Sequence, residues 1–217
     1  MPQGAVRQLR RFTRPCPPNG LRGFAPSREL ADWLTEVFLA TLGPLFNPDH
    51  QHLQDARLGV LWTSEENRSR GLSVAATAEI PRPPQGVNAW QRARFWQQIQ
   101  EWFGEWWEGE EPDFILTFSA PILGEAGDAE FCAVVEHELY HCGQKEEEGE
   151  PLFHRETGRP LWCLKPHDVE EFVGVTERYG AGVSRNVSRM VEAGRRTPTV
   201  APARLALACG LCLGKAA

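Results

Sequence analysis

The stretch "VVEHELYHCGQ" carries two histidines and a glutamate at the spacing of a metal-dependent hydrolase. His137 and His141 are four residues apart, so on a helix they lie one turn apart on the same face, with Cβ atoms roughly 5–6 Å from each other. Both imidazoles can then bind one ion, such as zinc. Glu138 is too close to His137 in sequence to join the same ligand set, but it can take a proton from water. The stretch therefore predicts a metal site with Glu138 as general base.

A catalytic zinc takes three protein ligands and keeps one position open, so a third side chain has to come from elsewhere. The candidates downstream are His154, His167, Glu170 and Glu171. His154 falls in a predicted hairpin, where a histidine is more often simply exposed. His167 is expected at the start of a helix, a rigid place from which its side chain can reach back. We favour His167, with Glu170 and Glu171 as alternative ligands and Asp168 or Glu170 as residues that orient the imidazole rings.

Helical and extended patterns around the motif predict one α+β domain. The expected helices cover 28–43, 88–107, a segment beginning near Asp128 that carries the motif, and 166–179. The expected strands cover 57–63, 72–80 and 113–119, and residues 151–165 are expected to form a hairpin. We expect the first two strands to pair as a hairpin and the third, nearly continuous in apolar residues, to be central. The prediction is a small, mostly antiparallel sheet packed against the motif helix and further helices.

Charge is unevenly distributed along the chain. The net charge is −6, yet residues 1–28 hold six arginines and no acid, and residues 174–217 hold six arginines and one lysine against two glutamates. The middle is therefore strongly acidic, which argues against a nucleic-acid-binding core, although basic arms can contact phosphates. We expect a disordered basic segment over 1–27, a folded domain over 28–180 and a basic, partly disordered tail over 181–217.

No apolar run approaches the roughly 18 residues that a membrane span needs. The first residues are basic but lack the apolar stretch of a secretory signal, so we expect a cytoplasmic protein with no membrane partner and with reduced cysteines. Cys142 and Cys163 are expected to be buried small hydrophobic residues. Cys209 and Cys212 form a C-x-x-C without a second pair, and we assign no metal or redox role to them.

The segments "DFILTFS", "FCAVVEHELYHC" and "KPHDVEEFVGVTERYG" resemble the putative phage metallopeptidase family, within the broader group of SprT-like minimal zincins. "HDVEEF" is similar to the "HGxEF"-like stretch that supplies the third zinc ligand of SprT-like proteins. The resemblance implies a zincin-like fold for the folded domain, zinc bound by His137, His141 and His167, Glu138 as general base, and a bacterial or prophage origin. The chain departs from the pattern at Asp168, where the family has glycine, and in the 25 residues between His141 and His167, which exceed the usual separation.

Two functions of different classes are compatible with these features. The first is a zinc metallopeptidase whose peptide or protein substrate pairs with an edge strand, 72–80. The second is a zinc-stabilised, non-catalytic binding module whose basic tails recruit DNA or a protein partner. Glu138 discriminates between them, because a structural zinc has no use for a carboxylate beside the metal. Candidates for stabilising the oxyanion are Tyr140, His154, Arg155 and Tyr179.

Overall fold

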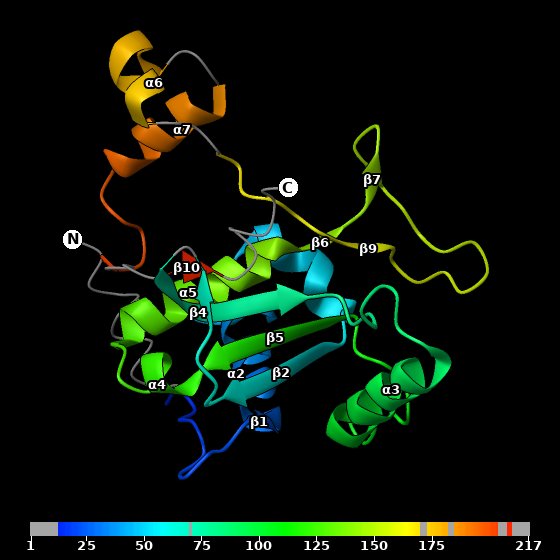
Figure 1. Cartoon of the computed structure of the whole chain (residues 1–217). Helices are drawn as coiled ribbons and strands as arrows, with labels where there is room; N and C mark the ends of the chain where they lie inside the picture. The colour runs from blue at the N-terminus through cyan, green and yellow to red at the C-terminus, as the bar shows by residue number, and fades with distance from the viewer. Residues whose placement is uncertain (1–12, 70, 170–172, 182–184, 204–207, 210–217) are drawn as a thin grey trace.

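The protein is an α+β structure in which helices surround a small mixed sheet (Figure 1). The computed structural model describes residues 13–69, 71–169, 173–181, 185–203 and 208–209. The strands of the main sheet are β1 (Phe24–Pro26), β2 (Leu58–Thr63), β3 (Arg68–Ser69), β4 (Leu72–Glu79), β5 (Phe114–Ser119) and β10 (Ala208–Cys209). The short strands outside it are β6 (Cys142–Gln144), β7 (Glu146–Glu147), β8 (Glu150–Pro151) and β9 (Trp162–Leu164). The helices are α2 (Arg28–Leu34), η1 (Thr35–Leu39), η2 (Pro48–Asp55), α3 (Ala89–Phe103), α4 (Ala120–Leu123), α5 (Asp128–His141), α6 (Val173–Tyr179) and α7 (Arg185–Gly194).

Strand β5 is central, as its apolar sequence predicts. The strand order is β1-β2-β5-β4-β10, with β3 also paired to β4. Strands β2 and β5 run parallel, as do β4 and β10, whereas the pairs β1–β2, β3–β4 and β4–β5 are antiparallel. The sheet is therefore mixed, and most of its described pairings are antiparallel. The predicted hairpin between 57–63 and 72–80 is wrong, because β5 lies between β2 and β4. The turn region between them forms β3, which pairs with the start of β4.

The outer edge of β4 is covered over part of its length, contrary to the expectation that 72–80 is an edge strand. β3 pairs with Leu72 and Ser73, and β10 runs parallel to β4 with Ala208 opposite Val74. Strand β1 lies within the range expected as an N-terminal segment, and α7 and β10 lie within the range expected as a tail. The domain boundaries stay a prediction. None of the described helices is long and apolar enough to cross a bilayer.

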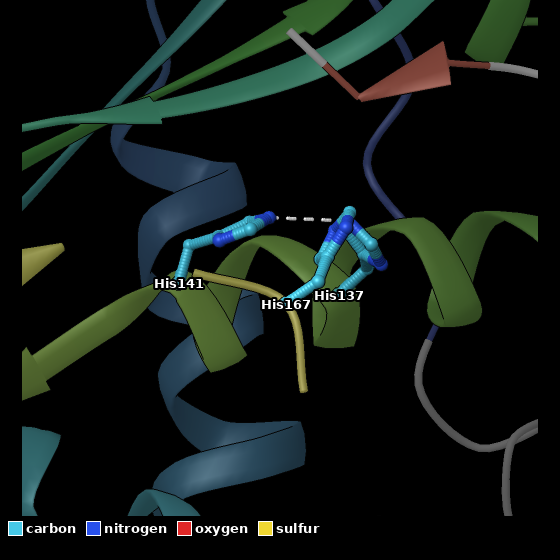
Figure 2. Close-up of side chains that lie close together, drawn as sticks. All are labelled: His137, His141 and His167. Carbon is cyan, nitrogen blue, oxygen red and sulfur yellow. Dashed lines mark hydrogen bonds between the residues drawn. The ribbon is translucent and has the colours of Figure 1, made fainter. Parts of the chain in front are cut away.

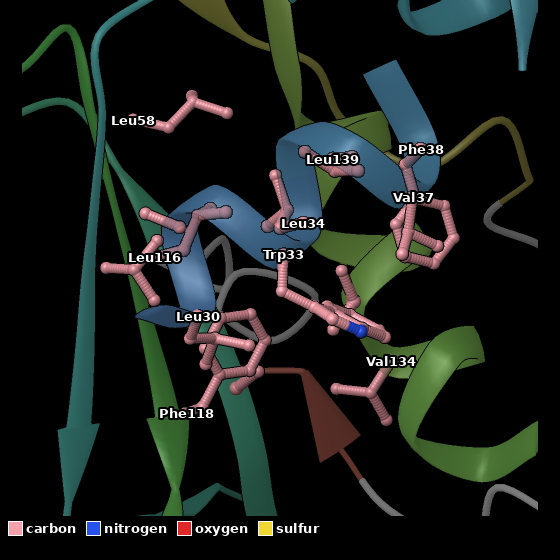
Figure 3. Packing of buried hydrophobic residues seen from close by; sticks show 14 of the residues in the cluster. Leu30, Trp33, Leu34, Val37, Phe38, Leu58, Leu116, Phe118, Val134 and Leu139 are labelled. Atoms are coloured by element: carbon pink, nitrogen blue, oxygen red, sulfur yellow. The ribbon is translucent and has the colours of Figure 1, made fainter. Parts of the chain in front are cut away.

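The main core lies between one face of the sheet and the helices α2, η1 and α5. Figure 3 shows side chains of all these elements meeting there, including Leu34 of α2, Leu116 of β5 and Val134 of α5, all of them buried. Helix α3 covers part of the opposite face of the sheet, where Ile99 and Phe103 are buried in a second cluster. The helix that carries the motif therefore packs into the larger of the two hydrophobic clusters.

Three predicted helices differ from the observed ones at their ends. The helix predicted over 28–43 changes from α2 into the π-helix η1, and Leu42 beyond it is 98% exposed. The helix predicted over 88–107 is α3, which contacts the core near its C-terminal end, so Trp90 in its first turn is 87% exposed. Within the helix predicted over 166–179, residues 166–169 are not helical, residues 170–172 lie outside the described residues, and α6 covers Val173–Tyr179.

Candidate metal centre

Helix α5 places His137 and His141 on one face, as their spacing predicts. It begins at Asp128, whose carboxylate in the first turn is favourable beside the positive end of the helix dipole. Phe131 and Leu139, both 0% exposed, fix the opposite side of the helix in the core. The imidazole rings of His137 and His141 have centroids 4.9 Å apart. The core thus holds two candidate ligands at a fixed separation.

The chain returns to α5 through a two-stranded ribbon that brings His167 beside this pair. Strand β6 follows His141 directly and pairs antiparallel with β9, with Cys142 opposite Leu164. The backbone N–H of Lys165 then donates to the carbonyl of His141 at 2.8 Å. The long separation between His141 and His167 in the sequence is therefore closed in space by the ribbon.

His167 does not stand at the start of a helix, so that part of the prediction is wrong. Residues 165–167 have no helical structure, and α6 begins at Val173. The physical reason is that the backbone of Lys165 bonds to the end of α5, which extends the β9 segment instead of starting a helix. The rigidity expected from a helix is supplied by this pairing.

The three histidines converge on one point (Figure 2). The Nε2 atom of His137 lies 3.2 Å from the Nε2 atoms of both His141 and His167, and one nitrogen from each ring lies within 4.8 Å of the others. A tetrahedral zinc with Zn–N bonds of about 2.0–2.1 Å holds its nitrogens roughly 3.3–3.4 Å apart. The observed separations therefore fit a zinc-sized ion. Within the described ranges no other group of three His, Cys, Asp or Glu residues meets in this way.

A backbone carbonyl fixes the tautomer of one candidate ligand. The Nδ1–H of His141 donates to the carbonyl of Lys165 at 2.7 Å, so its Nε2 presents a lone pair to the cluster. Burial, and then the neighbouring His141 and His167, lower the pKa of His137 to about 4. Burial also lowers the pKa of His141. Both rings are therefore neutral near pH 7, the state in which imidazole binds a metal.

The remaining predicted site residues lie in different places. Glu138 is on α5, 1% exposed, and is not a member of the histidine cluster, which agrees with a role other than ligand. Glu170 and Glu171 lie outside the described residues. The carbonyl of Asp168 accepts a hydrogen bond from Asn186 of α7 at 2.9 Å, so its observed contact ties the ligand segment to α7.

The oxyanion candidates Tyr140 and His154 are engaged elsewhere. The hydroxyl of Tyr140 accepts from Asn47 at 2.9 Å and donates to Asp49 at 3.0 Å, both at the start of η2. The Nδ1 atom of His154 accepts backbone N–H groups within its own turn, the nearer being Thr157 at 3.3 Å. Tyr140 thus serves to hold α5 against η2.

Sequence reasoning missed two groups that hold the site. One is the backbone of Lys165, which gives no signal in the sequence because any residue carries the same carbonyl and N–H. The other is His52 of η2, whose Nε2 bonds to the carbonyl of Cys142 at 2.9 Å and so fixes the start of β6. Cys142 is buried as predicted, whereas Cys163 is half-buried. Cys212 lies outside the described residues, and Cys209 belongs to β10.

The three-histidine cluster on and beside helix α5 could hold a metal ion, and a comparison with known protein families is compatible with such a site. The sequence model described as "Putative phage metallopeptidase" matches residues 31–195. Because this range covers most of the chain, the protein belongs to the putative phage metallopeptidase family. No curated protein and no solved structure matches the chain.

Proposed function

We propose that the protein is a zinc-dependent peptidase in which His137, His141 and His167 hold the metal and Glu138 is the general base. The family match and the histidine cluster point to a metal-dependent peptidase. The observation that carries the finer proposal is the separation of 3.2 Å between imidazole nitrogens. Zinc held by these residues supplies Lewis acidity toward a carbonyl and makes water a better nucleophile.

The chain's own residues perform the proton transfers. Glu138 follows His137 directly, so its side chain leaves α5 about 100° around the helix from that ligand, at the edge of the metal-facing side. In the proposed reaction its carboxylate takes a proton from the attacking water and returns it to the leaving amine. The carbonyl of Lys165 keeps His141 in the tautomer whose Nε2 binds the metal. The ribbon β6–β9 holds His167 in place.

The fold supports the further proposal of a zincin-like, SprT-like arrangement. A sheet with an antiparallel strand, β4, packs against the motif helix α5, and the third histidine follows from a separate segment. The substrate in this proposal is a peptide or protein. The alternative of a non-catalytic zinc module gives the same metal cluster but needs no carboxylate at position 138, so that residue provides the test.

The experiment measures zinc content and peptide hydrolysis for wild type and Glu138→Gln. Zinc content should stay at one per chain in both proteins, because Glu138 is not a ligand. Hydrolysis should fall about 10²–10⁴-fold in Glu138→Gln, the usual contribution of a general base.

Glu136→Gln is the matched control, because Glu136 precedes His137 as closely as Glu138 follows it. Its Oε1 accepts from Asn47 at 2.9 Å, and a glutamine keeps that acceptor, so hydrolysis should be retained. Undiminished hydrolysis in Glu138→Gln, or no hydrolysis by zinc-loaded wild type, would contradict the proposed function.

A further inference from the structure

A cavity of about 320 Å³ lies directly after the third histidine, between the ligand segment and α7. Asp168 and Val169 line it from the ligand segment, and Arg189, Met190 and Arg196 line it from α7 and the turn that follows. In Figure 1 the helices α6 and α7 stand together outside the sheet, joined to it by the chain that leaves β9. The cavity therefore belongs to the part of the molecule that carries His167.

The cavity is close enough to the metal position to receive a residue of a bound peptide. The Cα atoms of Asp168 and Val169 lie at most about 3.8 and 7 Å from that of His167. The histidine side chain and a zinc bond together span about 6 to 7 Å. The walls of the cavity thus begin within about 15 Å of the metal, and an extended substrate covers that distance in two to four residues.

A hydrogen bond keeps the two walls of the cavity together. The side-chain amide of Asn186 donates to the carbonyl of Asp168 at 2.9 Å. On the same helix, the hydroxyl of Ser188 donates to the carbonyl of Ala181 at 2.7 Å, which anchors α7 to the end of the preceding turn. The position of α7 is therefore coupled to the segment that carries His167.

The described lining of the cavity carries two arginines and two carboxylates, on a helix segment that is basic as a whole. Residues 185–196 contain four arginines against one glutamate, Glu192. Arg189 and Arg196 share the cavity with the carboxylates of Asp168 and Glu192, yet neither arginine forms an ion pair within 4.0 Å among the described residues. With respect to the described residues, their guanidinium groups keep donors available, and guanidinium binds carboxylate through paired hydrogen bonds.

We propose that this cavity is a specificity subsite in which Arg189 and Arg196 bind an acidic side chain of the peptide substrate, two to four residues from the scissile bond. The apolar side chains of Val169 and Met190 contact the aliphatic part of that side chain, for which glutamate is long enough. This inference rests on the proposed peptidase function and names the substrate class of the same site.

The test compares peptides that differ only in one glutamate or glutamine, placed at each of four positions on either side of the bond cleaved. For wild type with zinc, kcat/KM should be about tenfold higher for glutamate at one position, the usual effect of a hydrogen bond to a charged group. Arg189→Gln and Arg196→Gln should each remove most of this preference and leave zinc content unchanged. Glu192→Gln should increase it.

Arg185→Gln and Arg195→Gln are the matched controls, because these arginines belong to the same segment but do not line the cavity. An equal loss of the preference for glutamate in these controls would show that the net charge of the segment causes it, and the proposed subsite would be rejected. Equal cleavage of the glutamate and glutamine peptides by wild type would also overturn it, while leaving the peptidase function intact.

Binding of the same peptides to zinc-loaded Glu138→Gln, measured by fluorescence anisotropy, separates the two proposals. A preference for glutamate that depends on Arg189 and Arg196 should appear there without any hydrolysis. If wild type hydrolyses no peptide, the peptidase function fails, and the binding measurement alone then decides the subsite. Equal affinity for both peptides in that measurement would reject the subsite.

Discussion

The candidate metal centre has two halves that the chain builds in different ways. Helix α5 carries two of the proposed ligands within a single turn and is fixed by side chains of the main core. The segment 142–167 carries the third proposed ligand and is fixed by backbone pairing and by ion pairs near the surface. The first half therefore depends on core packing, and the second depends on hydrogen bonds whose partners are far apart in the sequence.

This difference separates overall stability from metal affinity. Changes in the core beneath α5 should unfold the protein, whereas changes in the ribbon should leave it folded and displace His167.

Phe131→Ala should cost the most stability. The ring of Phe131 is 0% exposed and lies 5.6 Å from Trp33 and 6.1 Å from Trp62, centroid to centroid. Removing a buried phenylalanine costs about 3–5 kcal/mol of the free energy of unfolding, which urea denaturation of the metal-free protein measures. Trp162→Ala in the ribbon is the comparison and should cost less. Trp162 is only half-buried, and its ring centroid lies 5.5 Å from that of Phe114. An equal loss in both variants would show that the two halves are not distinct.

His141→Ala and His167→Ala should both lose zinc affinity by more than about 100-fold, the upper range for residues that only support a ligand. Competition with a chromogenic chelator measures this loss. The two variants should differ in the metal-free protein. His141 is 4% exposed and bonds to the Lys165 carbonyl, so its loss should lower stability, whereas loss of the half-buried His167 should change it little. Zinc affinity equal to wild type in His167→Ala would rule out the proposed ligand set.

Arg159→Met should weaken zinc binding about tenfold by loosening the ribbon. Arg159 bonds to Asp113 at 2.7 Å and to Glu110 at 3.1 Å, which ties the hairpin before β9 to the start of β5. Supporting residues of this kind affect metal affinity by about 10–100-fold, and the partial exposure of Arg159 favours the lower value. Arg155→Met is the control, since Arg155 is exposed on the same hairpin. Equal zinc affinity in both variants would show that the bonds of Arg159 to Asp113 and Glu110 do not position His167.

Protonation of His50, which packs against Tyr140 of α5, should lower the free energy of unfolding in mild acid. Burial, and then repulsion by His52, lower the pKa of His50 to about 4, below the value of about 6.5 in the unfolded chain. As pH falls through 6.5 the unfolded state takes up the proton first, so this stability is present above pH 6.5 and is lost toward pH 4.

Between pH 7 and 5.5 the loss should be about 1 kcal/mol for this single group. Urea denaturation of wild type and His50→Gln across that range isolates the contribution, because the other titrating groups, including the neighbouring Asp49 and Glu136, are common to both proteins. Parallel pH profiles for the two proteins would show that His50 does not titrate as described.

The same division explains how far the sequence could predict the structure. The start of α5 at Asp128 and the pairing of His137 with His141 are local features, and the apolar run of β5 is a local sign of a central strand. The order of the strands is not local: adjacency in sequence predicts a hairpin between β2 and β4, but burial of β5 on both sides places it between them.

The third proposed ligand shows the limit most clearly. Residue type and its position after the motif predicted His167 as a candidate, but the sequence placed it at the start of a helix over 166–179. The observed surroundings depend on the backbone of Lys165 meeting the end of α5. Backbone groups are the same at every position, so no residue pattern could identify that contact.

Anomalous diffraction at the zinc absorption edge, from crystals of the protein loaded with one equivalent of zinc, tests the central claim most directly. We expect one zinc peak about 2.0–2.1 Å from an imidazole nitrogen of each of His137, His141 and His167, with Glu138 nearby but not coordinating. A zinc peak that excludes His167, or one in which Glu138 replaces a histidine, would contradict it.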